Sequence, residues 1–238
     1  MQFVCLRCGF NMVGYHPKNC PFCGAPKSKF ITMDECINKY NVESKKVTDN
    51  VHSLNSVPGL GYEHAAYRLY MGDKILWIDC PSTYDDELSA PGEILFTHHH
   101  FLGASNVYQE QGGSAIRIHE SDTKNSLCKN REFDVKFTRD FSIDELDAYH
   151  VNGHTPGFTI YVFGRCLFTC DYVFYRGDKL KFNPFSPMDK IKKQAEYIQE
   201  LLENEINTID FVCTYERIIP YAEWKPMFDK IFSNKEPT

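Results

Sequence analysis

The sequence lacks long apolar runs: none approaches the roughly 18 residues that a membrane helix needs, and the first 30 residues lack the apolar core of a signal peptide. Basic residues are also scarce, since 26 Lys and Arg face 32 Asp and Glu and the formal net charge is −6. This balance argues against a surface that neutralises the phosphates of DNA or RNA. We therefore expect a cytoplasmic protein with neither nucleic acid nor a membrane as partner.

Most of the ten cysteines lack a regular spacing. Four of them fall within the first 23 residues. This distribution fits metal binding better than a disulfide framework. The rest of the composition is that of a globular protein, and 238 residues allow one domain or one domain plus a small module. The cysteines without a pairing rhythm are Cys36, Cys80, Cys128, Cys166, Cys170 and Cys213.

Two C-x2-C pairs lie between residues 3 and 30, and a glycine directly follows each pair. The ligand candidates are Cys5 and Cys8 in the first pair and Cys20 and Cys23 in the second. Glycine tolerates the turn that points backbone amides at thiolate sulfurs. Two such knuckles predict a tetrahedral site for one Zn or Fe ion, which would supply the stability that a segment of about 30 residues lacks. Packing of four core thiols by chance is the weaker interpretation of this spacing.

The segment NCPFCGAPKSKF, together with Phe3, Phe10 and Phe30, resembles the rubredoxin-like domain at the end of rubrerythrins. The resemblance implies iron and one-electron transfer, whereas zinc in the same cage is structural because it has no redox chemistry. Both Fe and Zn stay open for the four-cysteine site. We assign residues 1–34 to this module and the polar residues 35–50, which lack sustained periodicity, to a linker.

Residues 51–238 alternate short apolar runs with occasional helical patterns, which predicts an α/β or α+β sandwich. A hairpin is expected around residues 71–73. A helix should follow Ser186, a suitable cap, and Pro187, because the next apolar residues recur at three and four positions and form a core-facing stripe. The strand candidates are residues 93–97, 115–118, 158–163, 166–170 and 209–213, and the stripe is Met188, Ile191, Ala195, Ile198 and Leu202.

Three histidines follow the apolar run 93–97 directly. Strand alternation would send His98 and His100 to one side and His99 to the other. His154 stands in a Gly/Thr/Pro turn between two strand candidates, and Asp171 follows a second apolar strand. A lone histidine is more often a satisfied core or surface group, but this set favours metal ligation.

The segments LWIDCP, THHH, GHTPG and LFTCD occur in this order over about residues 60 to 217, and they resemble the motifs of metallo-β-lactamase-fold proteins. The resemblance implies an α+β fold, the αββα sandwich, with metal at one edge of two facing sheets. It also implies that Asp79 supports a loop at the site. The catalytic and metal-binding residues that it implies are His98, His100, His154 and Asp171, which would hold one Fe or Zn ion.

The chain departs from this pattern at three places. Phe101 and Leu102 follow His100 directly, as though the family's Asp-His pair had been deleted between them, so a second metal would lack two ligands. The family's last histidine is absent, and Tyr215 or Glu216 stands near its place, with Glu216 as the only carboxylate that could replace a ligand. Cys170 replaces a glycine before the aspartate, and we expect it to pack as a small hydrophobe rather than lie near the metal.

Three functions stay open. In the first, an iron-dependent oxidoreductase, the rubredoxin-like centre supplies electrons to the mononuclear His/Asp site, since imidazole and carboxylate ligands suit Fe(II) as well as Zn. The second is a metal-dependent hydrolase of a thioester, ester or phosphoester with structural zinc in the four-cysteine site. The third is a degenerate member that acts in binding or regulation. The expected partners are a small-molecule substrate and a redox partner protein, and a homo-oligomer stays open.

Overall fold

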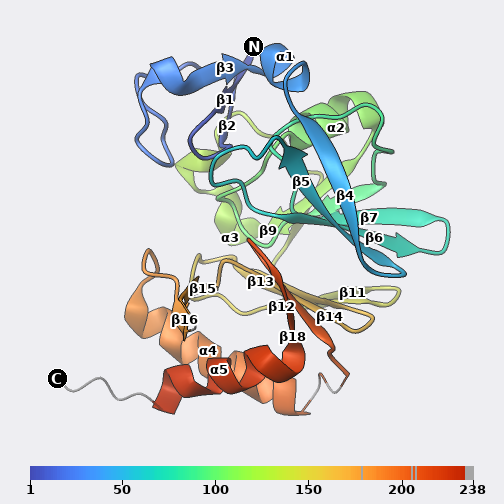
Figure 1. The fold of residues 1–238 in the computed structure, drawn as a ribbon, viewed down its shortest axis with the longest axis vertical. Helices are drawn as coiled ribbons and strands as arrows, with labels where there is room; N and C mark the ends of the chain where they lie inside the picture. The colour runs from blue at the N-terminus through green and yellow to red at the C-terminus, as the bar shows by residue number, and fades with distance from the viewer. Residues whose placement is uncertain (178, 205, 207, 234–238) are drawn as a thin grey trace. The chain divides into compact units, whose positions relative to one another are not determined.

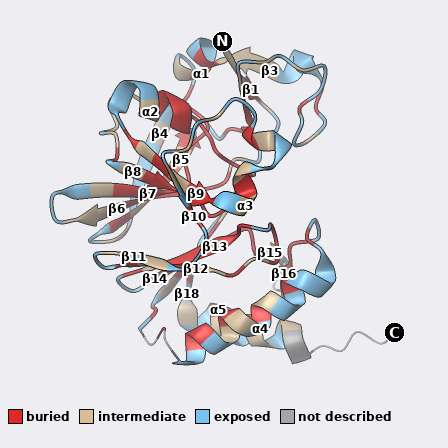
Figure 2. Cartoon of the chain, turned by 180° about the vertical axis from the view of Figure 1, so that it is seen from behind, coloured by how far each residue is buried: buried red, intermediate tan, exposed pale blue. Residues whose placement is uncertain are grey.

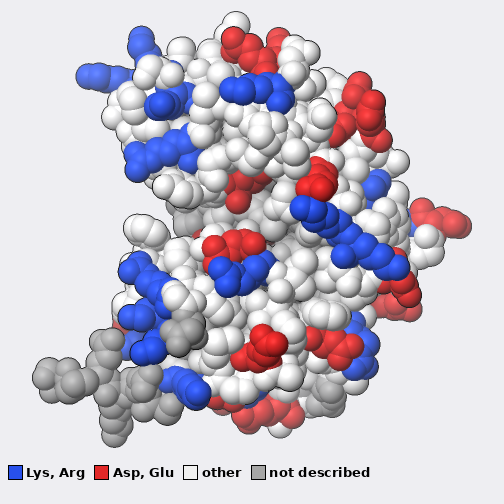
Figure 3. Space-filling view, viewed as in Figure 1, with Lys and Arg blue, Asp and Glu red and all other residues white. Residues whose placement is uncertain are grey.

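The computed structural model describes residues 1–177, 179–204, 206 and 208–233, which fall into two compact units, Met1–Phe137 and Thr138–Thr238. Each unit has its own β-sheets (Figure 1). Each also has its own hydrophobic core. No helix in the described ranges combines the length and the apolar character needed to span a membrane. The face drawn in Figure 3 carries both basic and acidic side chains, so it presents no single sign of charge.

A seven-stranded sheet of mixed direction forms the frame of the first unit. The strands pair in the order β10-β9-β8-β7-β6-β5-β4, antiparallel from β4 to β7 and parallel from β7 to β10. Figure 2 shows buried residues along its central strands. The bounds are β4 Asn41–Thr48, β5 Val51–Val57, β6 Ala66–Met71, β7 Lys74–Ile78, β8 Glu93–Leu95, β9 Ala115–His119 and β10 Val135–Phe137, with α2 Ser105–Gly112, α3 Glu120–Thr123 and a 3-10 helix Ser126–Cys128.

The cysteine-rich segment of the first unit contains a three-stranded antiparallel sheet in the order β2-β1-β3. Its elements are β1 Gln2–Cys5, β2 Asn11–Val13, a 3-10 helix Lys27–Lys29, β3 Phe30–Thr32 and α1 Met33–Ile37. A capping box begins α1: Glu35 N donates to Thr32 Oγ1 over 3.2 Å, and Thr32 N donates to Glu35 Oε2 over 2.7 Å.

The structure corrects the predicted linker at residues 35–50. These residues complete α1 and form β4, the edge strand of the seven-stranded sheet. Most of β4 is exposed, and Lys45 and Lys46 mark it as a charged edge, which explains its polar sequence. Val4 and Met33 belong to the same buried cluster as Trp77 of β7. The cysteine-rich segment is therefore part of the first unit, and the division between units falls after residue 137 rather than near residues 34 and 50.

The second unit contains a six-stranded sheet in the order β11-β12-β13-β14-β17-β18, in which only β14 and β17 pair in parallel. A separate hairpin, β15-β16, precedes the first helix of this unit. The bounds are β11 Phe141–Ile143, β12 Leu146–His150, β13 Thr159–Phe163, β14 Cys166–Cys170, β15 Val173–Arg176, β16 Lys179–Phe182, α4 Met188–Asn204, β17 Phe211–Thr214, β18 Ile218–Pro220 and α5 Tyr221–Ser233.

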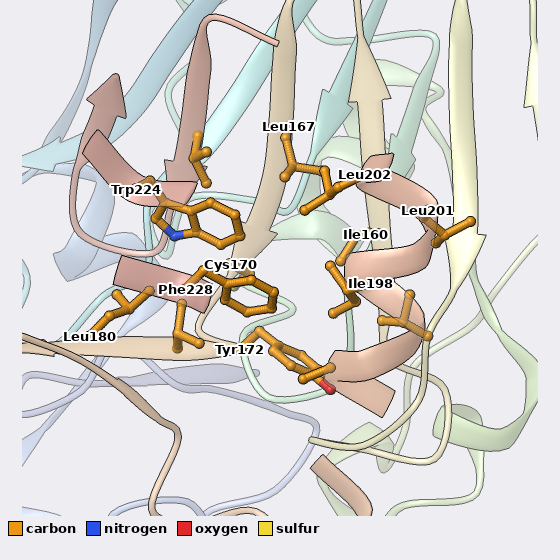
Figure 4. Close-up of a cluster of buried hydrophobic side chains, with 14 of the residues drawn as sticks. Ile160, Leu167, Cys170, Tyr172, Leu180, Ile198, Leu201, Leu202, Trp224 and Phe228 are labelled. Carbon is orange, nitrogen blue, oxygen red and sulfur yellow. The ribbon is translucent and has the colours of Figure 1, made fainter. Parts of the chain in front are cut away.

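Two helices cover the core of the second unit. Ile198 and Leu202 of α4 and Trp224 of α5 lie among side chains of β13 and β14 (Figure 4). The helix predicted after Pro187 is confirmed, and of its apolar stripe only Met188 is exposed. The hairpin predicted at residues 71–73 and the five strand candidates are also confirmed, as the turn between β6 and β7 and as β8, β9, β13, β14 and β17.

Met33 tests whether the cysteine-rich segment and the large sheet share one core. Its side chain is 6% exposed, so Met33→Ala should lower the free energy of unfolding by about 2 to 5 kcal/mol. Amide hydrogen exchange should accelerate in β6 and β7 as well as in β1 and β3. The exposed neighbour Asp34 is the control, because Asp34→Ala should stay within about 0.5 kcal/mol of the wild type. Faster exchange confined to residues 1–37 would contradict the shared core.

Candidate metal centres

The four cysteines predicted as ligands lie together in the first unit. One ligand atom from each comes within 4.8 Å of the others. The Sγ atoms of Cys5 and Cys23 are 3.7 Å apart, as are those of Cys8 and Cys20. A tetrahedral Zn ion with Zn–S bonds of about 2.3 Å separates its sulfurs by about 3.8 Å. The cluster therefore has the spacing of a four-thiolate metal site.

Both cysteine pairs form the turns predicted from their glycines. Gly9 N donates to Cys5 O over 2.7 Å, and Gly24 N donates to Cys20 O over 2.9 Å. The two glycines have φ angles of 78° and 71°, in the left-handed region where a residue without Cβ is favoured. The sequence pattern C-x2-C-G thus encodes the backbone that directs two sulfurs toward one point.

The second cysteine turn packs against the histidine loop of the same unit. The Phe22 ring, between Cys20 and Cys23 in sequence, has its centroid 5.5 Å from that of His100 and 4.7 Å from that of Phe101. Phe101 follows His100 directly, and the Asp-His pair that the metallo-β-lactamase-like pattern places after it is absent. An aromatic contact therefore joins the four-cysteine cluster to the histidine loop.

His98 is held through a short chain of hydrogen bonds. Thr97 Oγ1 donates to the Asp79 carboxylate at 3.0 and 2.9 Å and lies 3.0 Å from His98 Nδ1. Because the hydroxyl hydrogen points at the carboxylate, the hydroxyl oxygen accepts from Nδ1–H. This arrangement puts the imidazole proton on Nδ1 and leaves the Nε2 lone pair for an ion. Asp79 thus supports the histidine loop, as expected.

The other two histidines of this loop have different surroundings. His99 Nδ1 lies 3.1 Å from Asp122 Oδ2, and the His99 amide donates to the same oxygen. Asp122 is buried, so the pair fixes His99 inside the first unit. The centroids of the His98 and His100 rings are 4.7 Å apart. The His99 and His100 centroids are equally close, at 4.6 Å, but the group of ligand atoms within 4.8 Å of one another includes His98 and His100 and not His99.

His154 and Asp171 lie together in the second unit. His154 Nε2 is 3.3 Å from Asp171 Oδ2, and both side chains are buried. Two ligand atoms at about 2.0 Å from one tetrahedral ion are also about 3.3 Å apart. Ser186 Oγ lies 2.7 Å from His154 Nδ1, and Asn183 Nδ2 donates to Asp171 Oδ2 over 3.0 Å. These two residues hold the pair in a geometry that fits a metal ion.

Three residues that contact the candidate ligands were not predicted from the sequence to do so. Ser186 was expected only to cap α4, Asn183 carried no motif, and Phe22 was noted only as part of the cysteine segment. Ser186 and Asn183 lie in the loop before α4, 15 and 12 residues after Asp171, and no spacing rule connects a ligand to such a support. Their proximity to His154 and Asp171 arises from the path of that loop after the β15-β16 hairpin.

The other departures from the pattern are at Cys170, Tyr215 and Glu216, and the second unit contains all three residues. Cys170 lies in the hydrophobic core cluster, but its sulfur is also close enough to Asp171 to belong to a group that could hold a metal ion, so the expectation that it packs away from the metal stays a prediction. Burial, followed by the charges of Glu216 and Asp171, raises the pKa of the Tyr215 phenol, so this side chain stays neutral. Glu216 Oε1 lies 3.4 Å from Arg217 Nε. Replacement of a missing ligand by Glu216 stays a prediction.

No protein-family model and no curated protein matches the sequence. Among solved structures, the chain is similar to the mono-zinc form of the metallo-β-lactamase FIM-1 from Pseudomonas aeruginosa, with 12% identity, a TM-score of 0.64, and 94% of this chain and 100% of the other covered. The metallo-β-lactamase DIM-1 gives 13% identity, a TM-score of 0.61, and coverage of 81% and 98%. An archaeal metallo-β-lactamase superfamily protein from Sulfolobus tokodaii is 12% identical, with a TM-score of 0.55. The alignment covers 74% of this chain and 82% of that protein.

These likenesses confirm the fold class. The chain has the metallo-β-lactamase αββα sandwich fold, of mixed α+β class, with a small cysteine-rich module at its N-terminus. At identities of 12% and 13% they show the fold alone.

The four-cysteine cluster should bind one metal equivalent, more tightly at higher pH. Hydrogen bonds among the thiols raise the pKa of Cys8 and Cys20 and lower that of Cys5, so an ion must displace protons from the raised pair. Competition with a chelator at pH 6, 7 and 8 should show affinity rising at each step. Cys8→Ser should remove the equivalent, whereas Cys36→Ala, which changes a buried thiol outside the cluster, should retain it. An affinity independent of pH would contradict four-thiolate binding.

Thr97→Val should weaken metal binding at the histidine loop by about 10- to 100-fold, because valine keeps the side-chain shape but cannot accept from His98 Nδ1. The measurement is Co(II) titration with the cysteine cluster already filled by zinc. Thr48→Val, at the end of β4, is the matched control and should bind as the wild type does. Equal affinity of both variants would mean that the Thr97 hydroxyl does not orient the imidazole.

Proposed function

We propose that this protein is an iron-dependent oxidoreductase in which the four-cysteine centre passes electrons to an ion held by His98, His100, His154 and Asp171. A redox partner protein would reduce the four-cysteine centre, and a small-molecule substrate would receive the electrons at the second ion. Iron would supply the two oxidation states that this transfer needs, which zinc lacks.

The observation that carries the proposal is the contact of Phe22 with the histidine loop. A purely structural metal knuckle needs only to stabilise its own segment. Here the residue next to ligand Cys23 packs against His100, at a centroid distance of 5.5 Å. The thiolate cluster and the imidazole thus share a side-chain contact within one compact unit. Such a contact supports a short route for an electron between the two centres.

The donor set supports a single ion at the second centre. His98 and His154 each have a hydroxyl oxygen beside Nδ1, at 3.0 and 2.7 Å. These contacts favour the tautomer in which Nε2 can bind an ion. Three imidazoles and one carboxylate suit Fe(II) and Zn alike. The Asp-His pair that the pattern places after Phe101 is absent, so a second ion would lack those two ligands.

A metal-dependent hydrolase is the alternative. Its support is the fold, which resembles those of metallo-β-lactamases, one of them in a mono-zinc form. In such a protein the four-cysteine site would hold structural zinc, and the substrate would be a thioester, ester or phosphoester. The missing aspartate weighs against this reading, because a hydrolytic site needs a group that orients the attacking water.

Redox cycling of the iron-loaded protein distinguishes these functions. Anaerobic reduction should bleach an iron-thiolate absorption band, and its recovery after addition of dioxygen should be slower by about tenfold or more in His100→Ala and Phe22→Ala. Phe185→Ala, which removes a ring that is 84% exposed in the second unit, is the control and should recover at the wild-type rate.

Equal recovery in all variants would defeat the proposed route, because oxidation would then bypass the histidine site. A colourless protein purified with zinc in the cysteine cage, and active on an ester or thioester, would favour the hydrolase.

A further inference from the structure

A pocket of about 510 Å³ lies in the second unit, where β16 meets the first turns of α4 and the last turns of α5. Its volume is in the range of small-molecule sites, about 300 to 1,000 Å³. The described residues that line it include no candidate metal ligand, and neither Asn183 nor Ser186. The pocket is therefore a separate feature of the second unit.

All three elements contribute apolar side chains to the lining. Leu180 and Phe182 of β16 are buried and belong to the core of the second unit. Met227 and Ile231, one turn apart on α5, pack against the same core. Met188 at the start of α4 is 40% exposed. The pocket thus leaves apolar surface next to the core open to solvent, and its burial by a ligand would be favourable.

The same three elements also bring lysines to the pocket. Lys179 and Lys181 lie on β16, Lys192 on α4 and Lys230 on α5, and all four are exposed. No acidic residue occurs among the described residues of the lining, although acidic residues outnumber basic ones in the whole chain. Figure 3 shows basic side chains gathered at the lower left, where Figure 1 draws β16 and α4. The pocket is therefore a local site of positive charge on an acidic protein.

We propose that this pocket binds an amphiphile that has an aliphatic chain and a phosphate monoester head. The chain would cover the apolar lining, and the head would meet the lysines. A phosphate monoester carries a charge of about −1.5 to −2 at pH 7, so it can neutralise more than one lysine, whereas a carboxylate carries a single charge. Lysine ammonium groups are compact charges with three donors, which suit phosphate oxygens. The inference goes beyond the proposed function and needs neither metal centre.

The surface of an anionic membrane is the competing occupant. Phe185, 84% exposed, and its neighbour Pro184 lie beside the same lysines in sequence, and a ring near basic residues is also typical of membrane contact. The pocket favours the small molecule, because a layer of lipid headgroups does not fill a recess between a strand and two helices. The experiment includes vesicles so that this occupant is tested.

Isothermal titration calorimetry of the full chain tests the proposal with four probes. Decyl phosphate, below its critical micelle concentration, should bind more tightly than decanoate. Inorganic phosphate, which lacks the chain, and decyl maltoside, which lacks the charge, should not bind measurably. Lys181→Gln combined with Lys192→Gln should weaken decyl phosphate binding by about 2- to 5-fold for each lysine, as partly exposed charge pairs do. Lys193→Gln, the next residue on α4 and also exposed, is the matched control and should bind as the wild type does.

A second variant tests the apolar part of the pocket. Met188→Glu puts a negative charge into the lining and should weaken decyl phosphate binding by about tenfold or more. An acidic residue is favourable in the first turn of a helix, so this variant should keep the wild-type melting temperature. Phe185→Ala changes an exposed ring outside the described lining and should retain full affinity.

Three results would overturn the inference. Equal affinity for decyl phosphate and decyl maltoside would mean that the lysines do not select a charge. Unchanged affinity in the double lysine variant would place the phosphate elsewhere. Sedimentation with phosphatidylserine vesicles that Phe185→Ala abolishes, without any binding of decyl phosphate, would assign the region to a membrane. None of these outcomes bears on redox cycling at the metal centres, so the proposed function stands or falls separately.

Discussion

The packing of the cysteine turns against the first unit is the constraint on which the rest of the site depends. Arg7 O accepts from Tyr62 N over 3.1 Å in the loop that carries His64, and Phe22 packs against the loop that carries His100. Partly buried Arg131 adds a third contact, donating to Gly103 O over 2.8 Å and to Asn11 O over 3.4 Å. The cysteine-rich segment therefore contacts the loops that carry His64 and His100 directly.

His98 in the first unit and His154 in the second are oriented by the same kind of contact, a hydroxyl group beside Nδ1, although the surrounding elements differ. A hydroxyl beside Nδ1, from Thr97 in one unit and from Ser186 in the other, fixes the ring and directs Nε2 away from the backbone. Asp79 stabilises the first hydroxyl, and Asn183 stabilises the carboxylate beside the second imidazole. The histidines are thus held in place by protein contacts alone, which lowers the cost of ordering the site when an ion binds.

Sequence reasoning recovered the elements and the candidate ligands whose signals are local. The four cysteines are encoded by spacing and glycine turns, and α4 by a cap, a proline and an apolar stripe. The strand at residues 41–48 was missed because an exposed edge strand carries charged residues and no apolar alternation. Asn183 was missed for another reason: it acts through a contact with Asp171 from a loop 12 residues later, and such a contact has no period or motif.

Cys170 has a φ of 45°, so the residue before Asp171 is in the left-handed region although it carries a side chain. For such a residue this conformation costs roughly 1 to 2 kcal/mol, and the burial of the thiol in the second unit's core offsets part of that cost. The strand register is also irregular between Phe168 and Cys170, where β14 ends. The backbone at this position is one that glycine favours, while the residue is not glycine. A search pattern that demands Gly-Asp here passes over a chain that keeps the same turn.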